Sequence, residues 1–197
     1  MKTFLVEIKI SLVLTAVFAV LLCGVYPLAV WAGGQALFAD KANGSLVTDK
    51  DGTVRGSLLL AQNFASDKYF QPRLSAAGTG YDATSSSGTN YGPTSQKLND
   101  SIKAAVAAYR TANNLAADAA VPADAVTSSG SGLDPHISLA NASLQAARVA
   151  KARGLPLPQV QALIAQTARD RDWGIFGEPT VNVLQLNLAL EQKSAKP

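Results

Sequence analysis

The stretch Thr127–Gly154, TSSGSGLDPHISLANASLQAARVAKARG, joins a loop of small residues to the strongest helix signals in the chain. Asp134 is a favourable N-cap residue, and Pro135 suits the first helical position, where a missing amide costs nothing. Gly154 supplies the left-handed stop that ends many helices. The sequence therefore predicts a helix from Pro135 to Gly154, with a serine-rich loop just before it.

Four polar residues follow one another along this predicted helix at spacings of three, four and three. They are Ser138, Asn141, Gln145 and Arg148. This spacing places them in one stripe on the helix surface. Two interpretations stay open, the solvated face of an amphipathic helix and a recognition face. In either case a substitution such as Gln145→Ala is expected to leave the fold nearly unchanged.

The same stretch contains His136, the only histidine of the chain. A hydrolytic triad would need His136 as its base, but the chain has no G-x-S-x-G elbow. The helix dipole also disfavours an imidazolium at this position. We therefore expect a structural histidine and no catalytic residues, and the hydrolase alternative rests on His136 and the abundant serines alone. One histidine and the single Cys23 cannot form a zinc shell, so no metal site is expected.

The loop Ser128–Gly132 offers amide and hydroxyl donors beside a predicted helix N-terminus, which is a common setting for anion binding. It lacks the G-x-x-x-x-G-K-[ST] pattern, and no lysine follows that could meet a terminal phosphate. From these residues we expect weak ATP binding or none.

Outward from this stretch, the patterns predict an α/β (α+β) domain with a small sheet and several helices. Asp51-Gly52 indicates a hairpin turn between two strands. Leu74–Ser95 predicts a long loop, and its tyrosines, Tyr81 and Tyr91, favour a contact surface over a linker. The other expected elements are helices over Thr94–Leu115 and Gln159–Arg169, a short strand over Ala125–Ser129, and a helix, with a strand as alternative, over Thr180–Gln192.

The N-terminal part is apolar and uncharged from Ile10 to Ala39. Its most apolar portion, Ile10–Ala32, exceeds the roughly 20 residues that cross a bilayer as a helix. Lys2 and Lys9 precede this run and no cation follows until Lys41, which favours a cytoplasmic N-terminus. A cleaved signal peptide is the alternative, although its apolar region is usually about 7–15 residues long.

We therefore expect four segments. They are a cytoplasmic N-terminus (1–9), a transmembrane helix (10–32), a connector (33–44) and a domain outside the cytoplasm (45–197). The 17 Lys and Arg against 14 Asp and Glu are dispersed along the chain, so no nucleic-acid partner is expected.

A series of motifs runs in order along the chain. They are the N-terminal span, Tyr69–Arg73 with Ser75-Ala76 following, Tyr81–Ala83, Gly92–Ser95, Val121–Ser138, Gln145, Arg148–Ala150, Arg153-Gly154, Glu178-Pro179 and Val181–Leu184. Together they resemble the C subunit of the Kdp potassium-transporting ATPase, a bacterial P-type pump. Leu74 departs from the family pattern, in which a second proline follows Pro72-Arg73, and this affects only local loop rigidity.

The resemblance implies a non-catalytic accessory subunit of the inner membrane, with a periplasmic C-terminal domain that supports assembly. Its implied partners are a potassium-translocating channel-like subunit, an ATP-hydrolysing P-type subunit, a very small peptide subunit and membrane lipid. The family is also described as a catalytic chaperone, which implies ATP contacts at Ser128, Ser129, Gly130 and Gln145. This role conflicts with the expected topology, because a domain outside the cytoplasm does not meet cytoplasmic ATP.

We expect partner docking at a set of polar and aromatic side chains, namely Ser138, Asn141, Gln145, Arg148, Tyr81 and Tyr91. The alternative function is a membrane-anchored periplasmic solute-binding or interaction domain. In that case the stripe from Ser138 to Arg148 would line the pocket.

Overall fold

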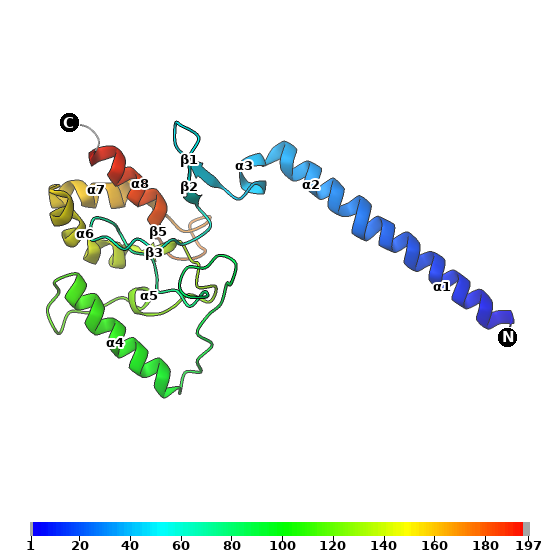
Figure 1. Ribbon diagram of the computed structural model, residues 1–197, viewed down its shortest axis with the longest axis horizontal. Coiled ribbons are helices and arrows are strands. Elements are labelled where there is room, and N and C mark those ends of the chain that lie inside the picture. Colours follow the sequence, from blue (N-terminus) through cyan, green and yellow to red (C-terminus); the bar gives the residue numbers. More distant parts are fainter. Residues whose placement is uncertain (1, 195–197) are drawn as a thin grey trace. The chain divides into compact units, whose positions relative to one another are not determined.

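The computed structural model describes residues 2–194 of the 197-residue chain. The chain divides into two compact units, one ending at Leu46 and the other beginning at Val47 (Figure 1). The first unit is helical, and the second combines two small sheets with several helices. The expected α+β class, with an apolar N-terminal helix before it, is confirmed.

The first unit is dominated by one long apolar helix. It consists of α1 (Lys2–Val20), a π-helical turn η1 (Leu21–Val25) and α2 (Tyr26–Leu37), and the short α3 (Ala39–Ala42) follows. The π turn lies just before Pro27, which lacks an amide donor and crowds the preceding turn of a regular helix.

Within residues 2–194, Thr3–Leu37 is the single helix long and apolar enough to cross a membrane, and it contains 35 residues. At 1.5 Å per residue it is about 50 Å long, more than the ~30 Å hydrocarbon core. The helix therefore continues from the predicted span into the first part of the expected connector.

Up to residue 194, the second unit contains two antiparallel sheets. Strands β1 (Leu46–Thr48) and β2 (Val54–Ser57) form the hairpin that Asp51-Gly52 predicts. The other sheet has the order β3-β5-β4, with β3 (His136–Ser138), β5 (Thr180–Asn182) and β4 (Ala168–Arg169). Its register pairs Ile137 of β3 and Ala168 of β4 with Val181, on opposite sides of β5.

Among the described residues of this unit there are five helices, namely α4 (Gln96–Ala112), α5 (Ala123–Val126), α6 (Leu139–Arg153), α7 (Leu157–Thr167) and α8 (Val183–Ser194). Helix α7 packs against both α6 and α8 (Figure 1). The apolar sides of these three helices meet the central strand, and the core they form includes Phe70, Ala142, Ala146, Val149, Val160, Leu163, Val181, Leu186 and Leu190.

The helix of the opening stretch begins later than predicted. Residues 136–138 form β3, and α6 starts at Leu139 with Ser138 as its N-cap, whose side chain accepts a hydrogen bond from the Asn141 amide. Asp134 instead accepts a hydrogen bond from the backbone of His136. Pairing of β3 with β5 outweighs the local capping signal. The predicted end is confirmed, because Gly154 is left-handed with φ 65°.

The other predicted elements of this unit have mixed outcomes. The strand predicted over Ala125–Ser129 is wrong, because α5 occupies its first part and ends at Val126. The helix predicted over Thr94–Leu115 is confirmed as α4, which Ser95 caps by accepting from the Leu98 amide. The ambiguous segment Thr180–Gln192 is both alternatives in succession, a short strand and then a helix.

The predicted loop Leu74–Ser95 has no helix and no extended strand, and it packs on the serine-rich loop. The Ser87 amide and the Ser86 hydroxyl both donate to the Ser131 carbonyl at 3.0 Å. Gly132 has φ +69°, and a Cβ there would lie only 2.5 Å from the Ser87 carbonyl oxygen. The two loops therefore support each other.

Candidate functional site

The polar stripe of α6 lies inside the domain. Asn141, Gln145 and Arg148 are only 1%, 2% and 6% exposed. The solvated-face interpretation is therefore wrong for these three residues. The physical reason is that a segment from distant sequence, Asp67–Arg73, lies over this side of α6 and takes up its hydrogen-bonding groups. This segment begins with a turn and has no regular secondary structure.

Two side-chain amides hold the middle of this segment. Gln145 accepts from the Gln71 amide at 2.8 Å and donates to the Gln71 carbonyl at 3.0 Å. Asn187 of α8 makes the equivalent pair of bonds with Phe70, at 2.8 and 3.0 Å. Each carboxamide thus supplies one donor and one acceptor, as a neighbouring strand would. We call Gln145 and Asn187 the amide clamps.

Arg148 extends the same network with a buried cation. Its guanidinium donates to the backbone carbonyls of Asp67 and Tyr69, at 2.8 and 3.1 Å, and to the Gln145 side chain at 2.9 Å. It also donates to the Asn113 side chain at 3.0 Å. Burial lowers the pKa of Arg148, and the exposed Asp67 carboxylate, 3.9 Å away, offsets this only in part. The charge is therefore stabilised mainly by neutral acceptors.

The N-terminal end of the stripe converges on a carboxylate that the sequence did not single out. Asp124 of α5 accepts from the Ser138 amide and hydroxyl, at 2.8 and 2.9 Å, and from the Asn141 amide group at 3.0 Å. Asn141 in turn accepts from the Tyr109 hydroxyl of α4 at 2.8 Å. Asp124 lies within the Val121–Ser138 motif but was given no role in a site, and Tyr109 lies in no motif. Their contacts join residues 14 to 32 positions apart, so local spacing does not reveal them.

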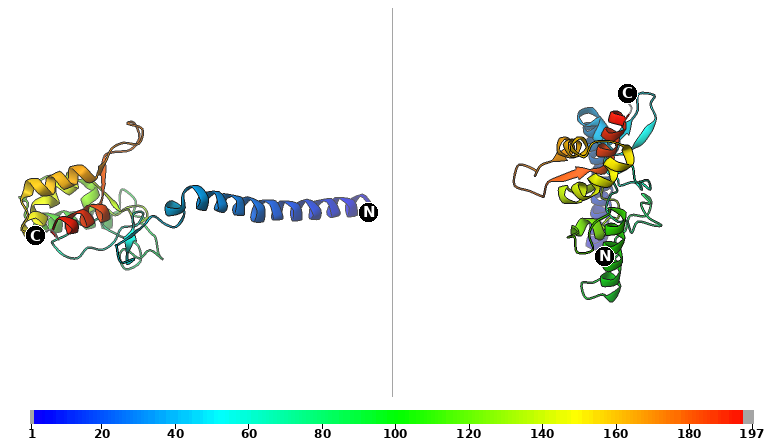
Figure 2. Two further views of the ribbon diagram at one scale, coloured as in Figure 1. Left: turned by 90° about the horizontal axis from the view of Figure 1, so that it is seen from above. Right: turned by 90° about the vertical axis from the view of Figure 1, so that its left-hand side faces the viewer.

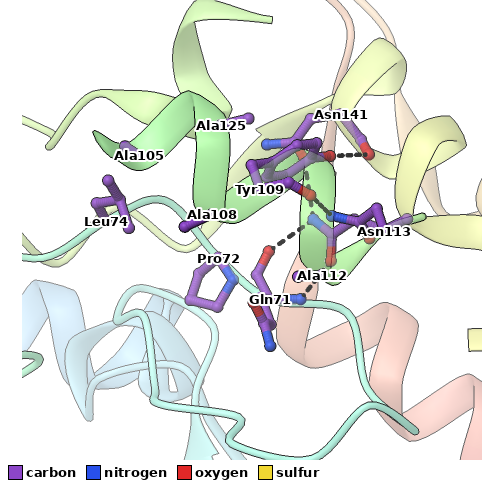
Figure 3. A pocket seen from close by; sticks show the side chains of 11 residues that line it. Gln71, Pro72, Leu74, Ala105, Ala108, Tyr109, Ala112, Asn113, Ala125 and Asn141 are labelled. Atoms are coloured by element: carbon purple, nitrogen blue, oxygen red, sulfur yellow. Dashed lines mark hydrogen bonds between the residues drawn. The ribbon is translucent and has the colours of Figure 1, made fainter. Parts of the chain in front are cut away.

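A cavity of about 170 Å³ lies beside this network, between α4 and the segment that covers α6. Figure 3 shows Ala105, Ala108 and Tyr109 on the α4 side, with Pro72 and Leu74 opposite them. The volume is below the ~300–1,000 Å³ of typical small-molecule sites. The polar side chains of Tyr109, Asn141 and Gln145 that line it already make hydrogen bonds within the domain. The cavity is therefore a seam at the edge of the core.

The predicted nucleotide contacts do not meet in one cavity. Gln145 lines the seam beside α4, whereas Ser129 and Gly130 line a separate cavity with Arg73 and Asp134, and the two share no lining residue. Strand β3 also separates the serine-rich loop from the start of α6, so this loop does not directly precede the α6 N-terminus. ATP contact at these residues stays a prediction.

Arg73 ties the serine-rich loop to the residues that follow it. Its guanidinium donates to the Asp134 carboxylate at 3.2 Å and to the Ser128 carbonyl at 3.3 Å. Burial opposes ionisation of Asp134, but hydrogen bonds from His136 and Arg73 outweigh it and lower the pKa of Asp134. His136 lies with its Nδ1 atom 3.5 Å from this carboxylate. The histidine thus belongs to the Arg73–Asp134 ion-pair group.

The two tyrosines of the long loop have different surroundings. Tyr81 is half-buried and donates its hydroxyl to the Arg73 carbonyl at 2.9 Å, and burial raises its pKa. Tyr91 is 43% exposed.

Within residues 2–194, no three His, Cys, Asp or Glu side chains gather closely enough to hold a metal ion.

Comparison with known proteins gives the family. The model of "K+-transporting ATPase, c chain" matches residues 8–192. The potassium-transporting ATPase KdpC subunit of Mycobacterium tuberculosis is 53% identical over 182 residues, which is 92% of this chain and 96% of that protein. The subunits of the same name from Rhodospirillum rubrum and Caulobacter vibrioides are 52% and 51% identical, over 93% and 95% of this chain and 94% and 93% of theirs. With nearly its whole length matched, and at about half identity, the chain belongs to the KdpC family of K+-transporting ATPase c chains.

Proposed function

We propose that this chain is a membrane-anchored, non-catalytic accessory subunit of an ATP-driven potassium transporter. The family match over residues 8–192 is the observation that carries the proposal. The role is to support assembly of the channel-like, ATP-hydrolysing and very small peptide subunits, and to modulate ATP turnover by the ATP-hydrolysing one.

The proposed location is a bacterial inner membrane, crossed once by the apolar helix. The leading lysines, Lys2 and Lys9, support a cytoplasmic N-terminus, with the domain on the periplasmic side. On that side the domain can act on the pump only through contacts with other subunits. Modulation is therefore mechanical in this proposal, transmitted by a domain whose buried polar network keeps its surface loops in fixed positions.

The buried polar network around Gln145 also limits contact with ATP. All four hydrogen bonds of the Gln145 carboxamide are made within the domain, to Gln71, Asn141 and Arg148. Contact with a nucleotide would require some of these bonds to break, which costs about 1–3 kcal/mol for each buried group left unpaired. We therefore propose that ATP binds weakly or not at all, and that Gln145 and Arg148 influence docking through the segment that they hold.

The experiment that tests the function is assembly of the transporter with and without this chain. The full-length chain is expressed with the other subunits, purified from detergent, and the co-purifying proteins are identified. We expect the other subunits to co-purify with the full-length chain. When the chain is left out, we expect potassium-stimulated ATP turnover to fall at least tenfold. Equal turnover with and without the chain, in an intact complex of the other subunits, would refute an accessory role.

A solute-binding domain is the alternative function. The seam lined by Asn141 and Gln145 is the cavity that this alternative requires. Its small volume, about 170 Å³, and its internally paired amides favour the accessory role. Saturable binding of a small solute by the full-length chain, lost in a Tyr109→Ala variant that still folds, would favour the alternative instead.

A further inference from the structure

The loop between β4 and β5 exposes three large apolar side chains next to one another. Trp173, Ile175 and Phe176 are 90%, 72% and 59% exposed. Both views in Figure 2 show this part of the chain, in brown-orange, extending away from the helices of the domain. Contiguous apolar side chains exposed in this way on a soluble domain commonly mark an interaction site. We call residues 170–179 the aromatic hairpin.

The aromatic hairpin has a defined conformation. Asp172 and Phe176 exchange both backbone hydrogen bonds, each at 2.9 Å. The Trp173 and Phe176 rings meet edge to face, with their centroids 5.9 Å apart and their planes at 74°. Trp173 has φ 55°, an uncommon conformation for a bulky residue, and Gly174 follows with φ 74°. The tip is thus a preformed knob, which lowers the entropy lost on docking.

The charges around this knob distinguish between a lipid surface and a protein partner. Arg169 pairs with Asp172 at 2.5 Å, and Arg171 pairs with Glu178 at 2.6 Å. Asp170 adds a further carboxylate, so the hairpin and its base carry more carboxylates than guanidinium groups. Attraction to an anionic membrane surface needs the opposite excess. The balance favours an apolar pocket of a protein.

We propose that the aromatic hairpin inserts Trp173 and Phe176 into an apolar pocket of another subunit of the K+-transporting ATPase, with a cationic rim that meets Asp170. This inference rests on the proposed function, because it requires that the chain assembles with those subunits. Large aromatic anchors seated in pockets carry most of the binding energy at many interfaces. The hairpin is then a docking element distinct from the buried stripe of α6.

The first test places the photo-crosslinking amino acid p-benzoylphenylalanine at position 173 of the full-length chain, within the purified complex. We expect light to join the chain to one other subunit, which mass spectrometry identifies together with the residues of its pocket. Position 157 is the matched control, because Leu157 is also apolar and exposed (39%) but lies on α7. We expect no such product from position 157.

The second test measures the affinity of the full-length chain for the other subunits in detergent. Trp173→Ala is expected to weaken binding about 30-fold, the scale of a strong interface anchor, whereas Leu157→Ala changes it less than threefold. Thermal unfolding of the Trp173→Ala chain should match the parent, because the removed side chain is 90% exposed.

The outcomes separate the docking inference from the proposed function. If the parent chain fails to assemble, the proposed function itself is refuted. If the complex forms but position 173 gives no protein crosslink and Trp173→Ala binds normally, only the docking inference is refuted. A bilayer contact is tested with Trp31→Phe, which leaves Trp173 as the only tryptophan. Quenching of its fluorescence by brominated lipids, in vesicles that contain this chain alone, would assign the hairpin to the membrane and overturn the proposal.

Discussion

At the scale of single residues, the amide clamps show why a polar residue on a helix need not be a surface residue. A carboxamide has both a donor and an acceptor, so one side chain can satisfy the backbone of an extended segment. Gln145 and Asn187 do this for Gln71 and Phe70, and the Phe70 ring is consequently seated in the core, 0% exposed. Their contribution is therefore to the fold.

Gln145→Ala is predicted to destabilise the domain by about 2–3 kcal/mol, since it leaves the Gln71 backbone and an Arg148 donor unpaired in a buried place. This reverses the expectation from the sequence that the fold would hardly change. Urea unfolding of the full-length chain in detergent, followed by circular dichroism, measures the effect. Ser143→Ala on the exposed side of α6 is the control and should cost less than about 0.5 kcal/mol. Equal stabilities of the two variants would contradict the clamp.

Asp134→Asn is predicted to lower stability at neutral pH by about 1 kcal/mol, because it removes the charged acceptor of Arg73 and His136. The pKa of Asp134 is depressed in the folded state, so the stabilisation is present above the unfolded pKa of about 4 and is lost as the pH falls through the lower folded pKa. Unfolding of parent and variant from pH 7 to pH 3 should therefore show a difference that shrinks in acid. A constant difference would mean that the carboxylate charge is not responsible.

At the scale of elements, the sequence was sufficient wherever the decisive interactions are local. The Asp51-Gly52 turn and the Gly154 stop both act within a few residues, and both predictions are confirmed. The helix predicted over Thr94–Leu115 is confirmed as α4, and its Ser95 cap, which was not singled out, also acts locally. The start of α6 was missed because both Asp134 and Ser138 are possible caps. Pairing of β3 with β5, some 44 residues later, selects Ser138.

The difference between local and tertiary interactions also explains how much of the candidate site could be predicted. The spacing of Asn141, Gln145 and Arg148 correctly placed them on one side of a helix, but it could not show that Asp67–Arg73 covers that side. The covering segment is about 75 to 80 residues away in sequence and has no regular secondary structure of its own. Burial of the stripe thus depends on tertiary contacts that no periodicity encodes.

Helix α4 is predicted to be the least protected long helix of the domain. None of its residues is buried, whereas seven residues of α6 are. It is attached through the Tyr109 hydroxyl on Asn141 and the Arg148 bond to Asn113. Hydrogen exchange of the full-length chain should be faster in α4 than in α6.

Tyr109→Phe should speed exchange of α4 further, roughly three- to tenfold, because the lost hydrogen bond is worth about 1 kcal/mol. Exchange in α6 should change less. The exposed Lys103→Ala on the same helix is the control and should leave the rates nearly as they are. If Tyr109→Phe has no effect on α4, this hydroxyl does not attach the helix to the domain.

At the scale of the whole molecule, the function depends on which side of the membrane the domain occupies. The long helix Thr3–Leu37 supplies the membrane association, and the family membership places the chain among subunits of a larger transporter. Neither sets the orientation. The orientation rests on Lys2 and Lys9 before the apolar run, and it decides whether the domain can meet cytoplasmic ATP.

We predict that protease added outside intact spheroplasts digests the full-length chain from Asp40 onward and leaves a membrane-bound fragment of the N-terminal helix. The short side of the span carries its cations close to the apolar run, and such cations are retained in the cytoplasm. A cytoplasmic protein must stay intact in the same sample, and opening the membrane should add no new fragments of the domain. Changing Lys2 and Lys9 together to Gln should weaken this orientation bias and yield a mixed population of the two orientations, which ties the orientation to these two charges.

Digestion only after the membrane is opened would place the domain in the cytoplasm. It would then meet ATP, so the contacts that the family resemblance implies at Ser128, Ser129, Gly130 and Gln145 would have to be tested directly by titration of the full-length chain.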